Sequence, residues 1–90
     1  MVKAIEVKAL KNFKLFVKFN DGVEGIVDLS HLKDGEAFKS WNEPGSFEKV
    51  YLDGPGIAWS DRLDIDALNV YLTITKQSFE DFNKKQSHHA

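Results

Sequence analysis

The chain has 90 residues and a mass of 10.2 kDa, which leaves room for one small domain with a single core. It contains no cysteine, and this excludes disulfides, thiolate metal ligands and a cysteine nucleophile. The net charge of −2 argues against a dedicated nucleic-acid binder, whose affinity comes mainly from neutralising phosphates. No apolar run approaches the roughly 18 residues of a membrane span, and the N-terminus lacks a signal peptide's apolar stretch, so we expect a cytoplasmic protein.

Charge is unevenly distributed along the chain. Residues 1–20 carry five lysines and one glutamate, whereas residues 21–66 carry eleven acidic and four basic residues. The candidate basic face consists of Lys8, Lys11, Lys14 and Lys18. We favour a solvated face over a binding patch, because short charge runs are usually surface.

Strands are predicted at the N-terminus and short helices after them. Alternating apolar residues predict three strands, over residues 2–9, 13–19 and 23–29. The alternation then breaks, which predicts a helical turn at 29–32, a short helix at 36–41 and a turn at 46–48. The short helix is expected to face the sheet with Ala37, Phe38 and Trp41.

The C-terminal half is predicted to return to strands and then to helix. Two strands, at 50–52 and 57–59, flank a Gly-Pro-Gly turn, and a strand end at 64–66 runs into a helix capped by Asp66. A last helix would carry Phe79 and Phe82, before a flexible tail at 87–90. These elements predict one α+β domain over residues 1–86, with an antiparallel sheet of about five strands and short helices on one face.

The register of the second hairpin can be predicted from its side chains. A three-residue loop with Gly22 in the left-handed conformation sets Lys18 opposite Glu24 and Lys14 opposite Asp28. A two-residue loop would instead set apolar residues against charged ones. Complementary cross-strand pairs are worth about 0.2–1 kcal/mol each, so we predict the three-residue loop.

The order of motifs along the chain resembles a known family. The motifs run Phe19-x-Asp21-Gly22-x-x-x-x-Val27-Asp28-Leu29-Ser30, Gly35-x-x-Phe38, Phe47-x-x-Val50-x-Leu52-Asp53, Trp59, Asp64-Ile65-Asp66 and Tyr71. This order is similar to that of the bacterial family known as domain of unknown function 2442. Such proteins tend to have proline where this chain has Ala67, and leucine where it has Val70. Proline fits the first position of a helix, so the family pattern supports Asp66 as a cap.

The resemblance implies a small bacterial protein that is often encoded beside a second small protein. That arrangement suggests an adaptor or a toxin–antitoxin pair, with the neighbouring product as the partner. Some relatives append a helix-turn-helix after the tyrosine, and the about nineteen residues that follow Tyr71 are too few for one. The family has no established active site, so the resemblance assigns no functional residue.

A metal site is one interpretation of Asp28-x-x-His31, which would place two ligands on one helical turn. Metal centres need three or four protein ligands, and the spacing indicates no third. The alternative is that Asp28 caps the turn or pairs with Lys14, while His31 lies on the surface.

An acidic cluster follows the strand predicted at 57–59. Asp61, Asp64 and Asp66 lie beside Arg62, and paired carboxylates can serve in acid–base catalysis or bind a divalent cation. The cluster does not fit the calcium-loop pattern. The alternative is a strand exit followed by a helix cap, with Asp61 in solvent.

Aromatic residues dominate the middle of the chain. Trp41, Phe47, Tyr51 and Trp59 could form a ligand groove, but in a domain of this size they are more often core. Trp59 is the best candidate for a half-exposed binding anchor, because it ends a short strand beside the aspartates and tryptophan is rarely fully buried.

Three hypotheses for function follow. In the first, which we favour, the chain is a non-enzymatic module that binds a protein partner or a second copy. It would use a sheet edge or the acidic segment at residues 53–66, with Trp59, Asp61, Arg62 and Asp64 as candidate contacts. In the second it is a nucleic-acid accessory protein that uses the basic face, and in the third a metal-dependent enzyme that uses the aspartates with His31. The first hypothesis implies no catalytic residues, no cofactor, no metal and no membrane.

Overall fold

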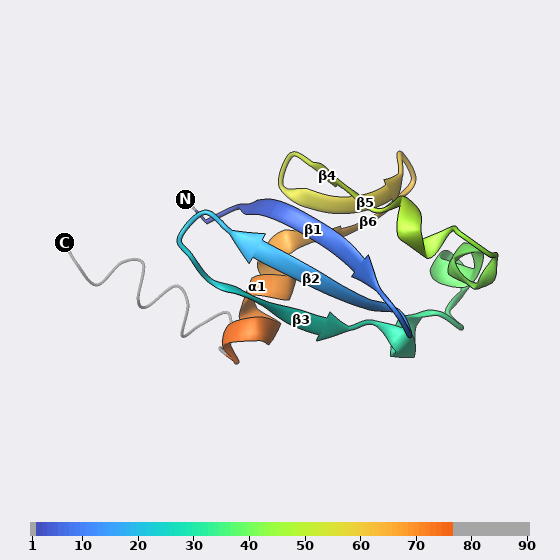
Figure 1. The fold of residues 1–90 in the computed structure, drawn as a ribbon. Coiled ribbons are helices and arrows are strands. Elements are labelled where there is room, and N and C mark those ends of the chain that lie inside the picture. The colour runs from blue at the N-terminus through green and yellow to red at the C-terminus, as the bar shows by residue number, and fades with distance from the viewer. Residues whose placement is uncertain (1, 77–90) are drawn as a thin grey trace.

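The computed structural model describes residues 2–76 and has an α+β fold (Figure 1). Its elements are β1 (Ala4–Leu10), β2 (Lys14–Phe19), β3 (Glu24–Asp28), the 3₁₀ turns η1 (Ser30–Leu32), η2 (Glu36–Asn42) and η3 (Phe47–Lys49), β4 (Tyr51–Asp53), β5 (Gly56–Ser60), β6 (Leu63–Asp66) and the helix α1 (Ala67–Thr75). The predicted last helix at Phe79 and Phe82 and the predicted tail lie outside the described residues. The α+β class is confirmed.

The strands form two three-stranded antiparallel sheets, ordered β1-β2-β3 and β4-β5-β6. The prediction of one sheet with about five strands is therefore wrong in count and in arrangement. The additional strand is β6, which was predicted only as a strand end before the helix. It pairs with β5 over its whole length, including Ile57 with Ile65 and Ala58 with Asp64.

The predicted hairpin register is confirmed. Lys14 lies opposite Asp28 and Lys18 opposite Glu24, and the Phe19 amide donates to the Val23 carbonyl at 2.8 Å. Gly22 has a φ of 93°, which is the left-handed conformation that a loop of three residues requires. The complementary cross-strand pairs therefore fixed the loop length.

The helical elements follow the prediction, with one exception. Asp66 caps α1, because its Oδ1 accepts a hydrogen bond from the Leu68 amide at 2.9 Å. In η2 the Trp41 side chain is buried and Phe38 is partly buried, but Ala37 is exposed. The prediction that Ala37 faces the sheet is wrong, because η2 is a 3₁₀ helix and brings a different set of residues onto one face.

The core lies between the two sheets and α1. The inner face of β2 contributes Leu15, Val17 and Phe19, each no more than 1% exposed, and β5 contributes Ile57. The sheets meet where β1 lies beside β4, while α1 packs against β3 (Figure 1). The first sheet therefore has β1 and β3 as its edge strands, and β1 contacts β4 and η3.

Candidate functional site

The outer face of the first sheet carries alternating charges. Its charged residues on β1, β2 and β3 are Glu6, Lys8, Lys14, Lys18, Glu24 and Asp28. The strand register forms three cross-strand rows, of which one runs from Glu6 through Lys18 to Glu24. The central row of the face has Lys8, Phe16 and Ile26.

The positions of these charges show whether the lysines of the candidate basic face form a positive surface. Lys8, Lys14 and Lys18 share the outer face of the sheet, and Lys11 is exposed in the β1–β2 turn. Three carboxylates lie among the three lysines on that face, so its strands carry no net charge. A continuous positive surface for phosphates is therefore not formed there.

β3 is an edge strand of the first sheet, and its free edge is the one that faces away from β2. Hydrogen-bonded pairs alternate along an antiparallel ladder, and Phe19–Val23 is such a pair. The amides and carbonyls of Glu24, Ile26 and Asp28 consequently point away from β2. Among residues 2–76 no strand pairs with this edge.

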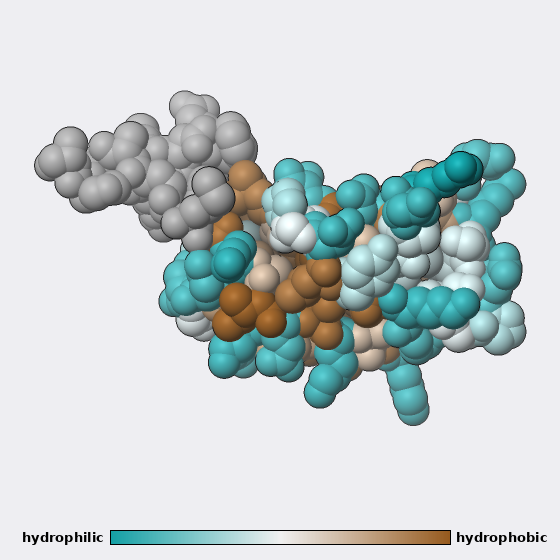
Figure 2. Space-filling model, turned by 90° about the horizontal axis from the view of Figure 1, so that it is seen from above, coloured by the Kyte–Doolittle hydropathy of each residue, from teal (hydrophilic) through white to brown (hydrophobic). Residues whose placement is uncertain are grey.

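Ile26 is the most exposed large hydrophobic side chain in the described part of the chain. It is 60% exposed, compared with 49% for Ile5 and 42% for Tyr51. Ile5 and Tyr51 belong to β1 and β4, the strands at which the two sheets meet. On the face seen from above, hydrophobic residues gather in the middle and hydrophilic side chains project around them (Figure 2).

A cavity of about 220 Å³ lies between β3 and α1. Its apolar lining includes Val27, Leu29, Ile65 and Val70, and its polar lining includes Asp28, His31, Asp66, Asn69 and Thr73. The cavity is therefore lined in part by the C-terminal end of β3, and two acidic residues, Asp28 and Asp66, are among its lining residues.

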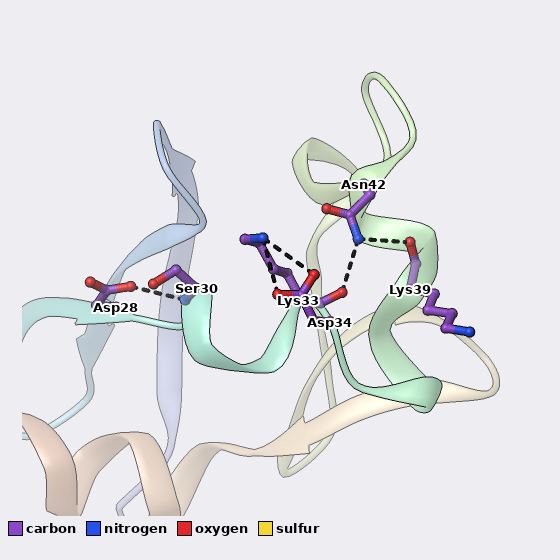
Figure 3. Close-up of polar contacts among 6 residues, drawn as sticks. All are labelled: Asp28, Ser30, Lys33, Asp34, Lys39 and Asn42. Atoms are coloured by element: carbon purple, nitrogen blue, oxygen red, sulfur yellow. Dashed lines mark hydrogen bonds and ion pairs between the residues drawn. The ribbon is translucent and has the colours of Figure 1, made fainter.

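The carboxylates of both acidic residues accept a hydrogen bond from a backbone amide two positions later in the chain. Asp28 Oδ1 accepts a hydrogen bond from the Ser30 amide at 2.9 Å (Figure 3), as the capping interpretation predicted. Hydrogen bonds from the Ser30 hydroxyl and amide lower the pKa of Asp28, and the charge of Lys14 adds to this effect. Asp28 is therefore ionised at neutral pH.

Polar contacts anchor the segment that follows β3. The Asn42 amide donates to the Lys33 carbonyl at 2.9 Å, which ties η2 to the end of η1 (Figure 3). Lys33 Nζ lies 3.2 Å from Asp34 Oδ2. His31 is exposed, as predicted for a surface residue. Asp28 and His31 line one cavity, but Asp64 does not line it.

The acidic segment lies on the second sheet, and of its residues Ile65 and Asp66 line that cavity. Asp61 and Arg62 form the β5–β6 turn, where the Arg62 amide donates to Ser60 Oγ at 3.2 Å. Asp64 is on the outer face, where its carboxylate lies over Gly56. Within residues 2–76, no three histidine, aspartate or glutamate side chains are placed to hold a metal ion.

Trp59 is buried, so the prediction of a half-exposed anchor is wrong. It is 7% exposed, and its Nε1 donates to the Phe47 carbonyl at 2.8 Å. Its ring packs against Trp41 and Phe47, with centroid distances of 4.7 and 5.6 Å. The turns η2 and η3 provide these two partners, and they close the aromatic core over β5. Tyr51 is the one member of the predicted aromatic set that is exposed.

A hydrogen bond between distant residues ties α1 to the β2–β3 turn. Tyr71 Oη donates to Asp21 Oδ2 at 2.7 Å. This bond, followed by burial, raises the pKa of Tyr71. Burial opposes ionisation of Asp21, but hydrogen bonds from Tyr71 and from the Val23 amide outweigh it and lower the Asp21 pKa.

Sequence reasoning proposed a sheet edge as a binding site but did not identify β3 as the strand that forms it. Its signal was Ile26, an isoleucine on the polar side of a strand whose alternate residues Gly25 and Val27 face inward. It also missed the hydrogen bond between Asp21 and Tyr71. Aspartate is common in turns such as the one before Gly22, so no sequence signal indicated a partner 50 positions away.

Within residues 2–76, two antiparallel sheets that meet at β1 and β4, together with the helix α1, define a small α+β domain. The family model described as "Protein of unknown function (DUF2442)" matches residues 4–76, from the start of β1 to the C-cap of α1, and the chain belongs to this family. Searches of the curated proteins and of the solved structures gave no match. Within residues 2–76 no helix is long and apolar enough to cross a membrane.

Proposed function

We propose that this protein is a non-enzymatic protein-interaction module. The observation that supports this is the free edge of β3, with which no strand of residues 2–76 pairs and at whose centre Ile26 is 60% exposed. Exposed strand edges are templates for pairing with another chain, and strand addition is a recurring mode of peptide recognition. The partner that the family resemblance suggests is the product of an adjacent small gene, as in an adaptor or a toxin–antitoxin pair.

The other two hypotheses have less support from the described residues. The lysines of the basic face alternate with acids, and the nucleic-acid hypothesis needs a continuous positive surface. The enzyme hypothesis needs His31 and the aspartates within hydrogen-bond reach of one substrate. The carboxylates of Asp28 and Asp66 accept hydrogen bonds from backbone amides, and Asp64 lies on the outer face of the second sheet.

The experiment is affinity purification of the full chain from its native host after nuclease treatment. We expect one protein in stoichiometric amount, which then rebinds as a purified protein. The variant Asp61→Lys with Asp64→Lys tests the acidic segment, because both side chains are exposed and neither is a helix cap. Loss of the partner from this variant would place the contact on the acidic segment. An eluate without a protein partner would contradict the proposed function.

A further inference from the structure

The alternating charges of the first sheet predict the chemistry of the strand that would extend it. We infer that the free edge of β3 binds a partner strand in which an apolar residue lies between two basic residues, in the order basic-x-apolar-x-basic. This inference rests on the proposed function and names its binding surface and the class of partner.

The outward side chains of β3 determine this pattern. They are Glu24, Ile26 and Asp28, so a strand added antiparallel would meet an acid, an exposed apolar residue and a second acid. Cross-strand pairs of opposite charge and of apolar residues stabilise a sheet, and like charges directly opposite destabilise it.

The chain already contains such a strand on the other side of β3. In β2, Lys14 lies opposite Asp28, Phe16 opposite Ile26 and Lys18 opposite Glu24. A partner with the same pattern would repeat these pairs across the free edge. The backbone groups that it needs, those of Glu24, Ile26 and Asp28, are the ones that face away from β2.

The inward side chains of the partner strand also have a place to lie. A residue opposite Val27 would point toward the cavity of about 220 Å³ between β3 and α1. Its lining by Ile65 and Val70 favours an apolar side chain there. The position opposite Gly25 is more restricted, because Ile74 packs closely against that glycine.

A second copy of this chain does not fit the same edge. Two β3 strands paired antiparallel about Ile26 would set Glu24 opposite Asp28 of the second copy, twice. Both acids are exposed, and Asp28 is ionised at neutral pH through its cap. Charge complementarity therefore selects a different chain with basic residues over a homodimer.

The test is an NMR titration of the isotope-labelled full chain with the synthetic peptide TKVFVKT. The backbone amides of Glu24, Ile26 and Asp28 should shift most, with a dissociation constant of about 0.1–1 mM for so short a strand. The matched peptide TEVFVET, with acids in place of the lysines, should bind at least about 5-fold more weakly. Shifts confined to other amides, or equal binding of the two peptides, would overturn the inference.

Two variants of the protein separate the backbone contribution from the charge contribution. Ile26→Pro removes an amide that faces the free edge and that β2 does not use, so the sheet should fold while peptide binding is lost. Glu24→Lys should weaken binding of TKVFVKT by about 3- to 5-fold and strengthen binding of TEVFVET. Ile26→Val keeps the edge amide and is the matched control, with binding close to the wild type. If Ile26→Pro does not fold, the inference is tested by Glu24→Lys alone. Affinities of Glu24→Lys for the two peptides that equal those of the wild type would overturn the inference.

The same variants distinguish failure of this inference from failure of the proposed function. A native partner that binds the wild type and Ile26→Pro equally would leave the interaction module intact and remove the edge as its site. Absence of any stoichiometric partner would contradict the proposed function itself.

Discussion

Gly25 of β3 lies against Ile74 of α1, and its replacement by alanine tests that packing. A Cβ atom at this position would lie 2.8 Å from Ile74 Cγ2 and 3.4 Å from Ile74 Cγ1. Favourable contacts between carbon atoms occur at about 3.5–4.0 Å. Because isoleucine is branched at Cβ and has one preferred rotamer in a helix, its Cγ2 atom cannot swing away freely. Either α1 or β3 must therefore shift.

Two opposing effects determine the size of the change for Gly25→Ala. Overpacking of a well-packed core costs about 1–3 kcal/mol, and Gly25 and Ile74 are partly buried against that core. Replacement of a strand glycine by alanine returns about 0.5–1 kcal/mol, because the unfolded chain loses conformational freedom. We therefore expect the free energy of unfolding to fall by about 1–2 kcal/mol, measured by urea denaturation followed by circular dichroism.

The matched control for Gly25→Ala is the double variant with Ile74→Ala. Ile74→Ala removes both atoms that the new methyl group would meet. The two substitutions should therefore couple, and Ile74→Ala should cost at least about 0.5 kcal/mol less in the Gly25→Ala background than in the wild type. If Gly25→Ala is more stable than the wild type, or if the two effects are additive, the close packing described here is wrong.

Three further predictions concern stability. Tyr71→Phe should lower the free energy of unfolding by about 1 kcal/mol at pH 7. The pKa of Asp21 is lowered and that of Tyr71 is raised, so the extra stability of the wild type over Tyr71→Phe should be lost below about pH 4 and above about pH 10. A difference in the free energy of unfolding that does not change with pH in urea titrations would contradict this hydrogen bond. Asp66→Ala should lower the free energy of unfolding by about 0.5–2 kcal/mol, measured by thermal unfolding, because the hydrogen bond from the Leu68 amide is lost. Asp66→Asn should keep most of this stability, and equal losses in the two variants would exclude the cap. The Leu15 side chain is 0% exposed, so Leu15→Ala should lower the free energy of unfolding by about 2–5 kcal/mol in chemical denaturation. A decrease below about 1 kcal/mol would exclude a core position.

Local features of this fold were predictable because neighbouring residues determine them. Complementary pairs across the turn fixed the three-residue loop around Gly22. Asp66 preceded an apolar helical run, which is the ordinary signature of an N-cap. Such features depend on the chemistry of a few residues that are close in the sequence.

The features that decide the candidate site depend on contacts between distant segments. Whether Trp59 is exposed depends on η2 and η3, which bring Trp41 and Phe47 over β5. Which strand is the free edge depends on β1 lying beside β4, and alternation along a strand carries no information about its neighbours. The sequence therefore predicted the strand that contains Ile26 but not its position at an edge.

The most direct test of the central claim is amide hydrogen exchange at β3, with and without the purified native partner. In the free protein, the amides of Glu24, Ile26 and Asp28 should exchange much faster than those of Gly25 and Val27, which bond to β2. On binding, exchange at the first three should slow by at least about tenfold. Unchanged exchange at these three amides, with new protection elsewhere in the complex, would contradict a partner strand on the edge of β3.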